Sequence, residues 1–256
     1  MDRLTKLNCM KHLLRFLPVL AVLLTACDKE AITPSGTITQ VSHPFYTDYF
    51  QVQVSDGIQF NITPSDSDKV VIETDDNVQA EIYVKQIGNI IYINRKEGSD
   101  VKWDQTTVKA HIFTTQTIST VQAGNGSTGT CDYTLYGEGG YMKILLSSGS
   151  TFTSSVNLTG GSLWVELSGG STANLSGKTK EMRLLSETGS TLNAYNLTTT
   201  NLILQIFSGG STAYNTVTDK IFAVEAKGGS TLYYKGAATI NPNSTFIEGA
   251  SAVPVN

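Results

Sequence analysis

The stretch Leu167-Ser168-Gly169-Gly170-Ser171-Thr172-Ala173-Asn174-Leu175 decides the fold of this chain. Its Gly-Ser-Thr core recurs through the second half of the sequence, and successive copies are 23, 21, 19, 21 and 19 residues apart. The copies begin at Gly126, Gly149, Gly170, Gly189, Gly210 and Gly229. An internal period of about 20 residues predicts a solenoid, in which each repeat forms one coil that stacks on its neighbours.

The residues around each copy alternate in polarity with a period of two. Fifteen of the eighteen residues at seven, five and three positions before the motif glycines are apolar. These positions include Met142, Ile144 and Leu146 in one coil, Ile203, Gln205 and Phe207 in another, and Phe222, Val224 and Ala226 in the last. Such alternation marks strands that bury one face. We therefore predict an all-β fold, a parallel β-helix or β-solenoid with coils of about 20 residues and one continuous core.

The motif itself is predicted to form the corner of each coil rather than a ligand site. Glycine permits a bend with positive φ. The serines share the parity of the inward residues and are expected to stack inside the corner: Ser127, Ser150, Ser171, Ser190, Ser211 and Ser230. The threonines have the opposite parity and are expected to form an outward ladder: Thr128, Thr151, Thr172, Thr191, Thr212 and Thr231. Cys131 has inward parity, which favours a small core residue.

The chain before the repeat differs in pattern and charge. Short apolar runs at 52–54, 58–62, 70–73 and 90–93 predict strands, and Asp56-Gly57 predicts a turn. Residues 28–123 carry a net charge of −6, whereas residues 124–256 carry −1. We therefore predict an acidic β-rich cap or first coils over 43–123, the repeat solenoid over 124–249, and a tail over 250–256.

An acidic cluster near loops, Asp66, Asp68, Asp75 and Asp76, raises the question of a calcium site. The cluster lacks the ligand spacing of an EF-hand, and a solvated run of charges is the favoured interpretation. We therefore predict no metal site and no cofactor, and leave calcium binding at this cluster open.

The first 26 residues are predicted to be an export signal. Basic residues precede an apolar run from Phe16 to Leu24, which is shorter than the roughly 20 residues of a spanning helix. Leu24-Thr25-Ala26-Cys27 resembles the cleavage site of a bacterial lipoprotein, and the resemblance implies that Cys27 is lipidated and attaches the chain to a membrane. Residues 27–42 then form a tether. The predicted location is the outer membrane, and the periplasmic or cell-surface orientation is left open.

Charge limits the partners that the mature chain can attract. Removal of residues 1–26 changes the net charge from −4 to −7. An acidic exported domain has no electrostatic attraction to nucleic acid, so no nucleic-acid partner is expected. The exposed strand edges at the ends of a solenoid must be capped or paired, which leaves self-association open.

The order of these elements resembles a family of exported Bacteroidetes proteins, the putative auto-transporter adhesin, head GIN domain family. The matching features are the opening Phe50 to Ile62, the hairpin-like Ile82 to Asn94, and the string of Gly-Ser-Thr coils. The resemblance covers about residues 45–249. It implies a mostly parallel β-helix on a lipoprotein anchor, and it brings no catalytic residues.

Direct inspection finds little chemistry that would support catalysis. The mature chain has two histidines, His43 and His111, and no nucleophile, phosphate-loop or zinc motif. We predict a non-catalytic adhesin or scaffold for a glycan or protein, with the outward aromatic residues Trp164, Tyr214 and Tyr233 as candidate contacts. Two alternatives stay open: a polysaccharide lyase or hydrolase, and an ice-binding surface built on the threonine ladder.

Overall fold

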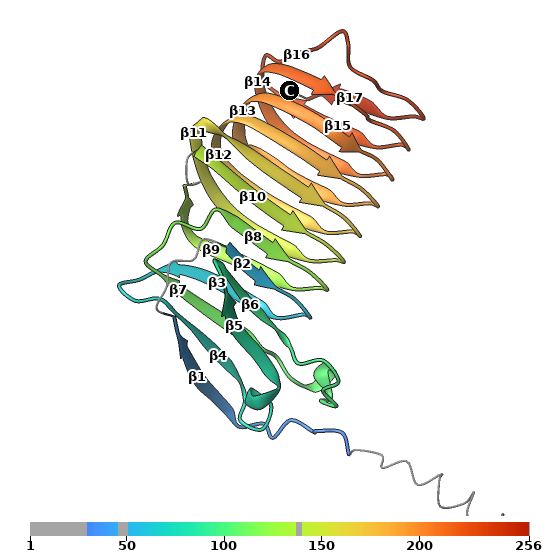
Figure 1. The fold of residues 1–256 in the computed structure, drawn as a ribbon. Helices are drawn as coiled ribbons and strands as arrows, with labels where there is room; N and C mark the ends of the chain where they lie inside the picture. Colours follow the sequence, from blue (N-terminus) through green and yellow to red (C-terminus); the bar gives the residue numbers. More distant parts are fainter. Residues whose placement is uncertain (1–29, 46–50, 137–139, 256) are drawn as a thin grey trace, which may run out of the picture.

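The computed structural model describes residues 30–45, 51–136 and 140–255. The predicted all-β parallel solenoid is confirmed: its coils stack on one another, and a mixed sheet precedes them (Figure 1). The described helical structure consists of two 3-10 turns, Gln79–Glu81 and Trp103–Gln105. The signal segment and Cys27 lie outside the described residues.

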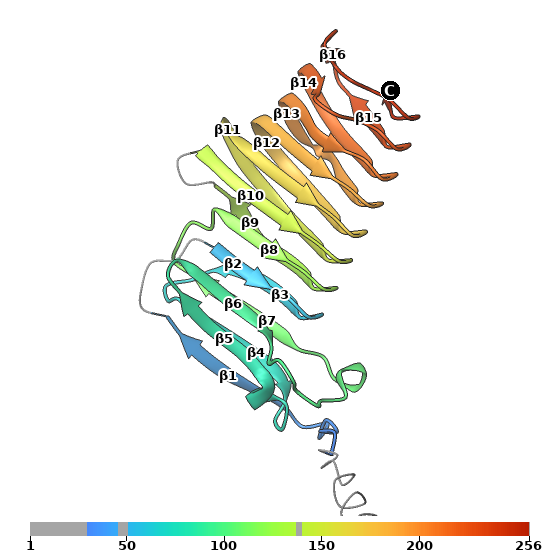
Figure 2. The same ribbon diagram turned by 45° about the vertical axis from the view of Figure 1, so that its right-hand side comes forward.

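The strands form one hydrogen-bonded system that folds over into two layers (Figure 2). We call the first layer the Thr sheet. In order across the layer it contains β1 (Ile38–Pro44), β4 (Lys69–Asp75), β7 (Lys109–Thr114), β3 (Gln59–Pro64), β9 (Thr128–Leu135), the first halves of β11 (Thr151–Leu167), β12 (Thr172–Ser186), β13 (Thr191–Phe207) and β14 (Thr212–Ala223), then β15 (Thr231–Lys235) and β17 (Ser251–Pro254).

The second layer, the Trp sheet, is built from the strands that enter each corner. In order it contains β5 (Ile82–Ile87), β6 (Ile90–Arg95), β2 (Gln51–Val54), β8 (Thr120–Ala123), β10 (Tyr141–Leu146), the second halves of β11 to β14, and β16 (Thr239–Ile240). Pairing is parallel throughout the coils and antiparallel for β1–β4, β4–β7 and β5–β6. The antiparallel strands extend both layers beyond the first coil.

Each corner is a tight turn whose two central residues both have positive φ. The φ angles lie between 50° and 79°, the range of a type I′ turn. The described chain has eight such corners: Asp56-Gly57, Asn125-Gly126, Ser148-Gly149, Gly169-Gly170, Thr188-Gly189, Gly209-Gly210, Gly228-Gly229 and Glu248-Gly249. A Cβ on Gly170 would meet nothing within 4 Å, so its φ of 73° and not crowding calls for glycine.

The corner serines lie inside the coil, and the corner threonines face outward. All six serines are fully buried, whereas the threonines stack in register from Thr128 to Thr231. The Ser171 hydroxyl donates to the Leu146 carbonyl of the previous coil at 3.1 Å, and the Ser171 hydroxyl oxygen accepts a hydrogen bond from the Ser168 amide at 3.1 Å. The hydroxyls of Ser150, Ser190, Ser211 and Ser230 each bond the carbonyl three residues earlier. A small hydroxyl thus fits the corner and satisfies a backbone group there.

Two of the corners lack the Gly-Ser-Thr motif. At Asp56-Gly57 the serine position holds the buried Ile58, and the strand that follows pairs with β9. The coil after this corner is interrupted by the segment that forms β4, β5 and β6. At Glu248-Gly249 the threonine position holds Ser251, which is in register with Thr231. The ladder therefore continues into 250–256, and β1 takes in part of 27–42.

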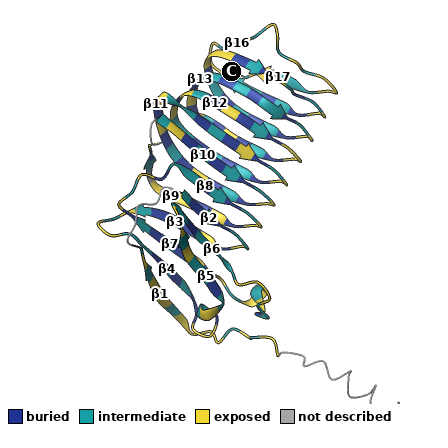
Figure 3. Ribbon diagram, in the orientation of Figure 1, coloured by how far each residue is buried: buried dark blue, intermediate teal, exposed yellow. Residues whose placement is uncertain are grey.

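Buried residues alternate with more exposed ones along most of the coil strands, and the core is continuous from coil to coil (Figure 3). Phe60, Gly129 and Phe152 occupy the same position in successive coils. The two rings stack with their centroids 6.0 Å apart, and a Cβ on Gly129 would lie 2.0 Å from the Phe60 ring. Gly129 therefore makes room for a ring from the neighbouring coil.

The inward assignment of four residues was wrong. Leu202, Leu204, Ile221 and Ala223 are fully or almost fully buried, whereas Ile203, Gln205, Phe222 and Val224 are not. The register of β12 with β13 shifts by one residue between Leu184 and Leu185. Because an extra residue in a strand reverses the parity of every residue on one side of it, these coils carry apolar residues on both faces.

A polar groove on the Thr sheet as the candidate functional site

The outer surface of the Thr sheet carries ladders of polar side chains at matching positions of successive coils. Next to the corner threonines runs a second outward row, which changes along the solenoid from histidine and asparagine through threonine and asparagine to tyrosine. In order it holds His111, Asn61, Thr130, Thr153, Asn174, Asn193, Tyr214 and Tyr233. We call this the second row.

Side-chain amides in the second row bond from one coil to the next. Asn193 Nδ2 donates to Asn174 Oδ1 at 2.8 Å, and Asn174 Nδ2 donates to Thr153 Oγ1 at 3.1 Å. Because each amide is held by its neighbour, the row offers its other polar atoms in fixed positions.

Three hollows with shared walls follow the second row and form one shallow groove. The first is lined by Gln59, Asn61, Lys109, His111 and Thr130, together with Phe60 and Thr128. The second, of about 510 Å³, shares Thr130 and extends to Asn193 and Asn196. The third, of about 430 Å³, shares these two asparagines and ends at Tyr195 and Tyr214. The lining of the second and third hollows contains no charged side chain.

One end of the groove is aromatic. The rings of Tyr214 and Tyr233 stack with centroids 5.2 Å apart and an interplanar angle of 12°. Tyr195 meets Tyr214 edge-on at 5.3 Å, and Lys235 Nζ lies 4.9 Å from the centre of the Tyr195 ring. Burial raises the pKa of Tyr195, and its two tyrosine neighbours add to the effect.

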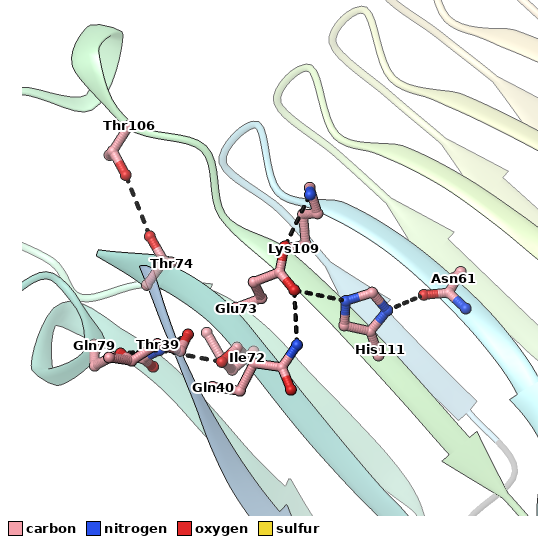
Figure 4. Close-up of polar contacts among 10 residues, drawn as sticks. All are labelled: Thr39, Gln40, Asn61, Ile72, Glu73, Thr74, Gln79, Thr106, Lys109 and His111. Carbon is pink, nitrogen blue, oxygen red and sulfur yellow. Dashed lines mark hydrogen bonds and ion pairs between the residues drawn. The ribbon is translucent and has the colours of Figure 1, made fainter. Parts of the chain in front are cut away.

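The other end is charged (Figure 4). Glu73 Oε1 lies 2.8 Å from Lys109 Nζ, and Glu73 Oε2 accepts a hydrogen bond from Gln40 Nε2 at 2.8 Å. His111 Nε2 lies 3.9 Å from Glu73 Oε2, and its Nδ1 lies 2.7 Å from Asn61 Oδ1. The hydrogen bond from Lys109, followed by that from Gln40, lowers the pKa of Glu73. The histidine is thus fixed between a carboxylate and an amide, in β7 between β4 and β3.

The three aromatic contacts expected from the sequence do not form one site. Tyr214 and Tyr233 are adjacent on the Thr sheet, whereas Trp164 lies on the Trp sheet, between Lys143 and Arg183. Sequence reasoning missed Tyr195, because the register of β13 with β14 shifts between Ala194 and Thr198 and places Tyr195 beside Tyr214. It also missed Asn174 and Asn193, whose position two residues after the corner threonine could have indicated the row.

The acidic cluster is divided between the two ends of β4. Asp68 accepts hydrogen bonds from the amide and hydroxyl of Thr115 at one end. At the other end the buried Asp75 accepts bonds from the Gly36 amide and the Thr106 hydroxyl, both at 2.6 Å. Within residues 30–45, 51–136 and 140–255, no group of three or more His, Cys, Asp or Glu is placed to hold a metal ion. Cys131 is half-buried and packs against the core.

Comparison with known proteins places the chain in a family. The family model described as "Putative auto-transporter adhesin, head GIN domain" matches residues 48–238, well over half of the sequence. The chain belongs to this family. A search of curated proteins gave no match. Among the described residues, no helix is long and apolar enough to cross a membrane.

Solved structures of Bacteroides and Parabacteroides proteins share the fold. A putative adhesin from Bacteroides fragilis superposes with a TM-score of 0.70 at 18% identity, covering 88% of this chain and 97% of its own. A putative adhesin from Parabacteroides distasonis gives 0.65 at 17% identity, with 88% and 100% coverage. A protein from the same species described as a putative lipid binding protein gives 0.64 at 12% identity, with 89% and 100% coverage.

Proposed function

We propose that this protein is a lipid-anchored, non-catalytic envelope adhesin that binds an extended neutral glycan along the groove of the Thr sheet. The observation that carries the proposal is the second row, in which hydrogen-bonding amides lead into stacked tyrosines. Sugar rings present hydroxyls at their edges and C–H groups on their faces. Amides and hydroxyls pair with the former, and aromatic rings cover the latter.

The spacing of the coils favours a polymer that runs along the solenoid axis. Parallel strands lie about 4.8 Å apart, which is close to the length of one hexose in an extended chain. Each coil can therefore offer one second-row side chain to one sugar. The absence of charged lining in the second and third hollows favours neutral sugars over uronic acids or sulfated chains.

Binding by the full chain to an array of neutral and acidic glycans tests this proposal. Tyr214→Ala and Tyr233→Ala are each expected to weaken binding of a neutral polysaccharide about tenfold, because each removes a stacking surface worth about 1 kcal/mol or more. Tyr92→Ala, which removes a tyrosine from β6 in the opposite sheet, is the matched control and should leave affinity unchanged. The proposal would be contradicted if all three variants lost affinity equally, if no glycan bound saturably, or if a bound glycan were cleaved.

The anchor is proposed from the sequence around Cys27 and is tested separately. In cells fed an alkyne fatty acid, the wild-type chain should acquire the label and sediment with membranes, whereas Cys27→Ala should do neither. Protease treatment of intact cells would then separate a surface position from a periplasmic one. Labelling of Cys27→Ala equal to that of wild type would refute lipidation at this residue.

A further inference from the structure

The outer face of the Trp sheet has a chemistry opposite to that of the groove. On β10 to β14 its outward positions form two neighbouring rows that are rich in large apolar side chains. The first row is Lys143, Trp164, Arg183, Ile203 and Phe222. The other row is Leu145, Glu166, Leu185 and Ile206, and it is extended by Val224, which is 43% exposed and lies just beyond β14, next to Glu225, the residue that aligns with Ile206. We call these ten residues the Trp face.

From this pattern we propose that the Trp face is the contact between two copies of this chain in a two-fold dimer. The proposal does not depend on glycan binding. Contiguous apolar surface of this kind on a folded domain marks an interaction site. The outer surface of these five strand segments, each about six residues long, spans about 24 Å across the strands and about 20 Å along them, so a contact over all of it reaches the low end of specific interfaces.

The charges of the Trp face are complementary to the face itself. Consider a two-fold axis that is parallel to the solenoid and lies midway between the two rows. Each residue of one row then faces the partner's residue from the other row of the same coil. Glu166 then faces the partner's Trp164, which is flanked by the partner's Lys143 and Arg183 in the adjacent coils. Ile203 meets the partner's Ile206, and Phe222 meets the partner's Val224. Glu166 thus meets two cations of the partner, of which Arg183 is also paired with Glu181 of its own chain at 2.9 Å, and the apolar ends meet each other.

The position of the chain ends agrees with this axis. β1 and the described segment that leads into it lie at the end of the molecule remote from the last coils (Figure 1). An axis parallel to the solenoid places both N-terminal ends on the same side, so two copies could be tethered to one membrane surface. The Thr sheets point away from the interface, and both grooves stay open.

Charge exchange tests the dimer. Sedimentation of the full chain in a mild detergent is expected to show a concentration-dependent dimer. Glu166→Lys alone, or Lys143→Glu with Arg183→Glu, should weaken it tenfold or more by placing like charges together. The triple variant that combines all three changes should restore the dimer, because it returns opposite charges to opposite sites. Rescue of this kind cannot come from misfolding.

Glu97→Lys, which makes the same charge change on an exposed turn far from the Trp face, is the control and should dimerise as wild type does. A chain that stays monomeric at several hundred micromolar would overturn the proposal. So would a dimer that survives Glu166→Lys, or a triple variant that fails to recover.

Discussion

At the scale of single residues, the corner shows why the sequence repeats Gly-Ser-Thr. The glycine provides the second left-handed residue of the turn, the serine hydroxyl fits the interior and bonds a backbone carbonyl, and the threonine begins the outward ladder. Asn, Ser, Thr or Gly occupies the first left-handed position of the motif corners, so that position tolerates more than the second does. Conformation thus selects the glycine, and burial with hydrogen bonding selects the serine.

The corner serines are not equivalent, and this makes a test possible. Ser171 Oγ contacts the Leu146 carbonyl and the Ser168 amide, whereas Ser127 Oγ is buried with no hydrogen-bond partner in the structure. We expect Ser171→Ala to lower the free energy of unfolding by about 1 kcal/mol. Ser127→Ala should be neutral or slightly stabilising, because it removes an unsatisfied hydroxyl. Denaturant titration of both variants measures the difference, and equal losses would contradict this account.

At the scale of strands, the sequence predicts the coils well and their irregularities poorly. The period, the corner positions and the inward residues of β10, β11 and β12 follow from alternation alone. The register shift within β13 could not be predicted, because Ile203 and Leu204 are both apolar. The sequence fits a strand with either of these residues facing the core. The same ambiguity concealed the Trp face. Likewise, the sequence left residues 43–123 as either a cap or first coils, since Ile58 and Gln59 stand where later coils have serine and threonine.

The strands added before the first coil are linked by charge as well as by the ladder. Glu73 on β4 holds Gln40 on β1 and Lys109 on β7. Because these contacts lower the pKa of Glu73, they stabilise the fold above the carboxyl's ordinary value and are lost as pH falls through the lowered one. Glu73→Gln should therefore melt at a lower temperature than wild type at pH 7, and the gap should close as pH falls from about 5 to about 3.

The effect on melting should be small, since the lysine is half exposed. In Lys109→Met, the loss of thermal stability at acid pH should begin at a higher pH than in wild type. The substitution removes the largest cause of the lowered pKa of Glu73. A difference between wild type and Glu73→Gln that does not change with pH would show that Glu73 acts through packing and not through its charge.

At the scale of the whole molecule, the two layers have divided their outer surfaces between polar and apolar chemistry. The Thr sheet presents amides, hydroxyls and tyrosines along the groove, whereas the Trp face presents aliphatic and aromatic residues with three charges among them. In the proposed dimer, two parallel grooves face opposite directions from one pair of anchors. A surface coated with a repeating glycan would then be held at two points, and the second attachment would form at high effective concentration.

The direction of the inter-coil hydrogen bonds has a mechanical consequence. In a parallel solenoid these bonds run along the axis, and every coil is joined to the next by a full turn of them, corner included, as in the bond from Gly170 to Thr188. A force applied between the first strand and the last coils acts on all the hydrogen bonds between two neighbouring coils at once. Failure under tension is then expected to release one coil at a time, each adding about 20 residues of slack, so that the protein lengthens in steps before it gives way.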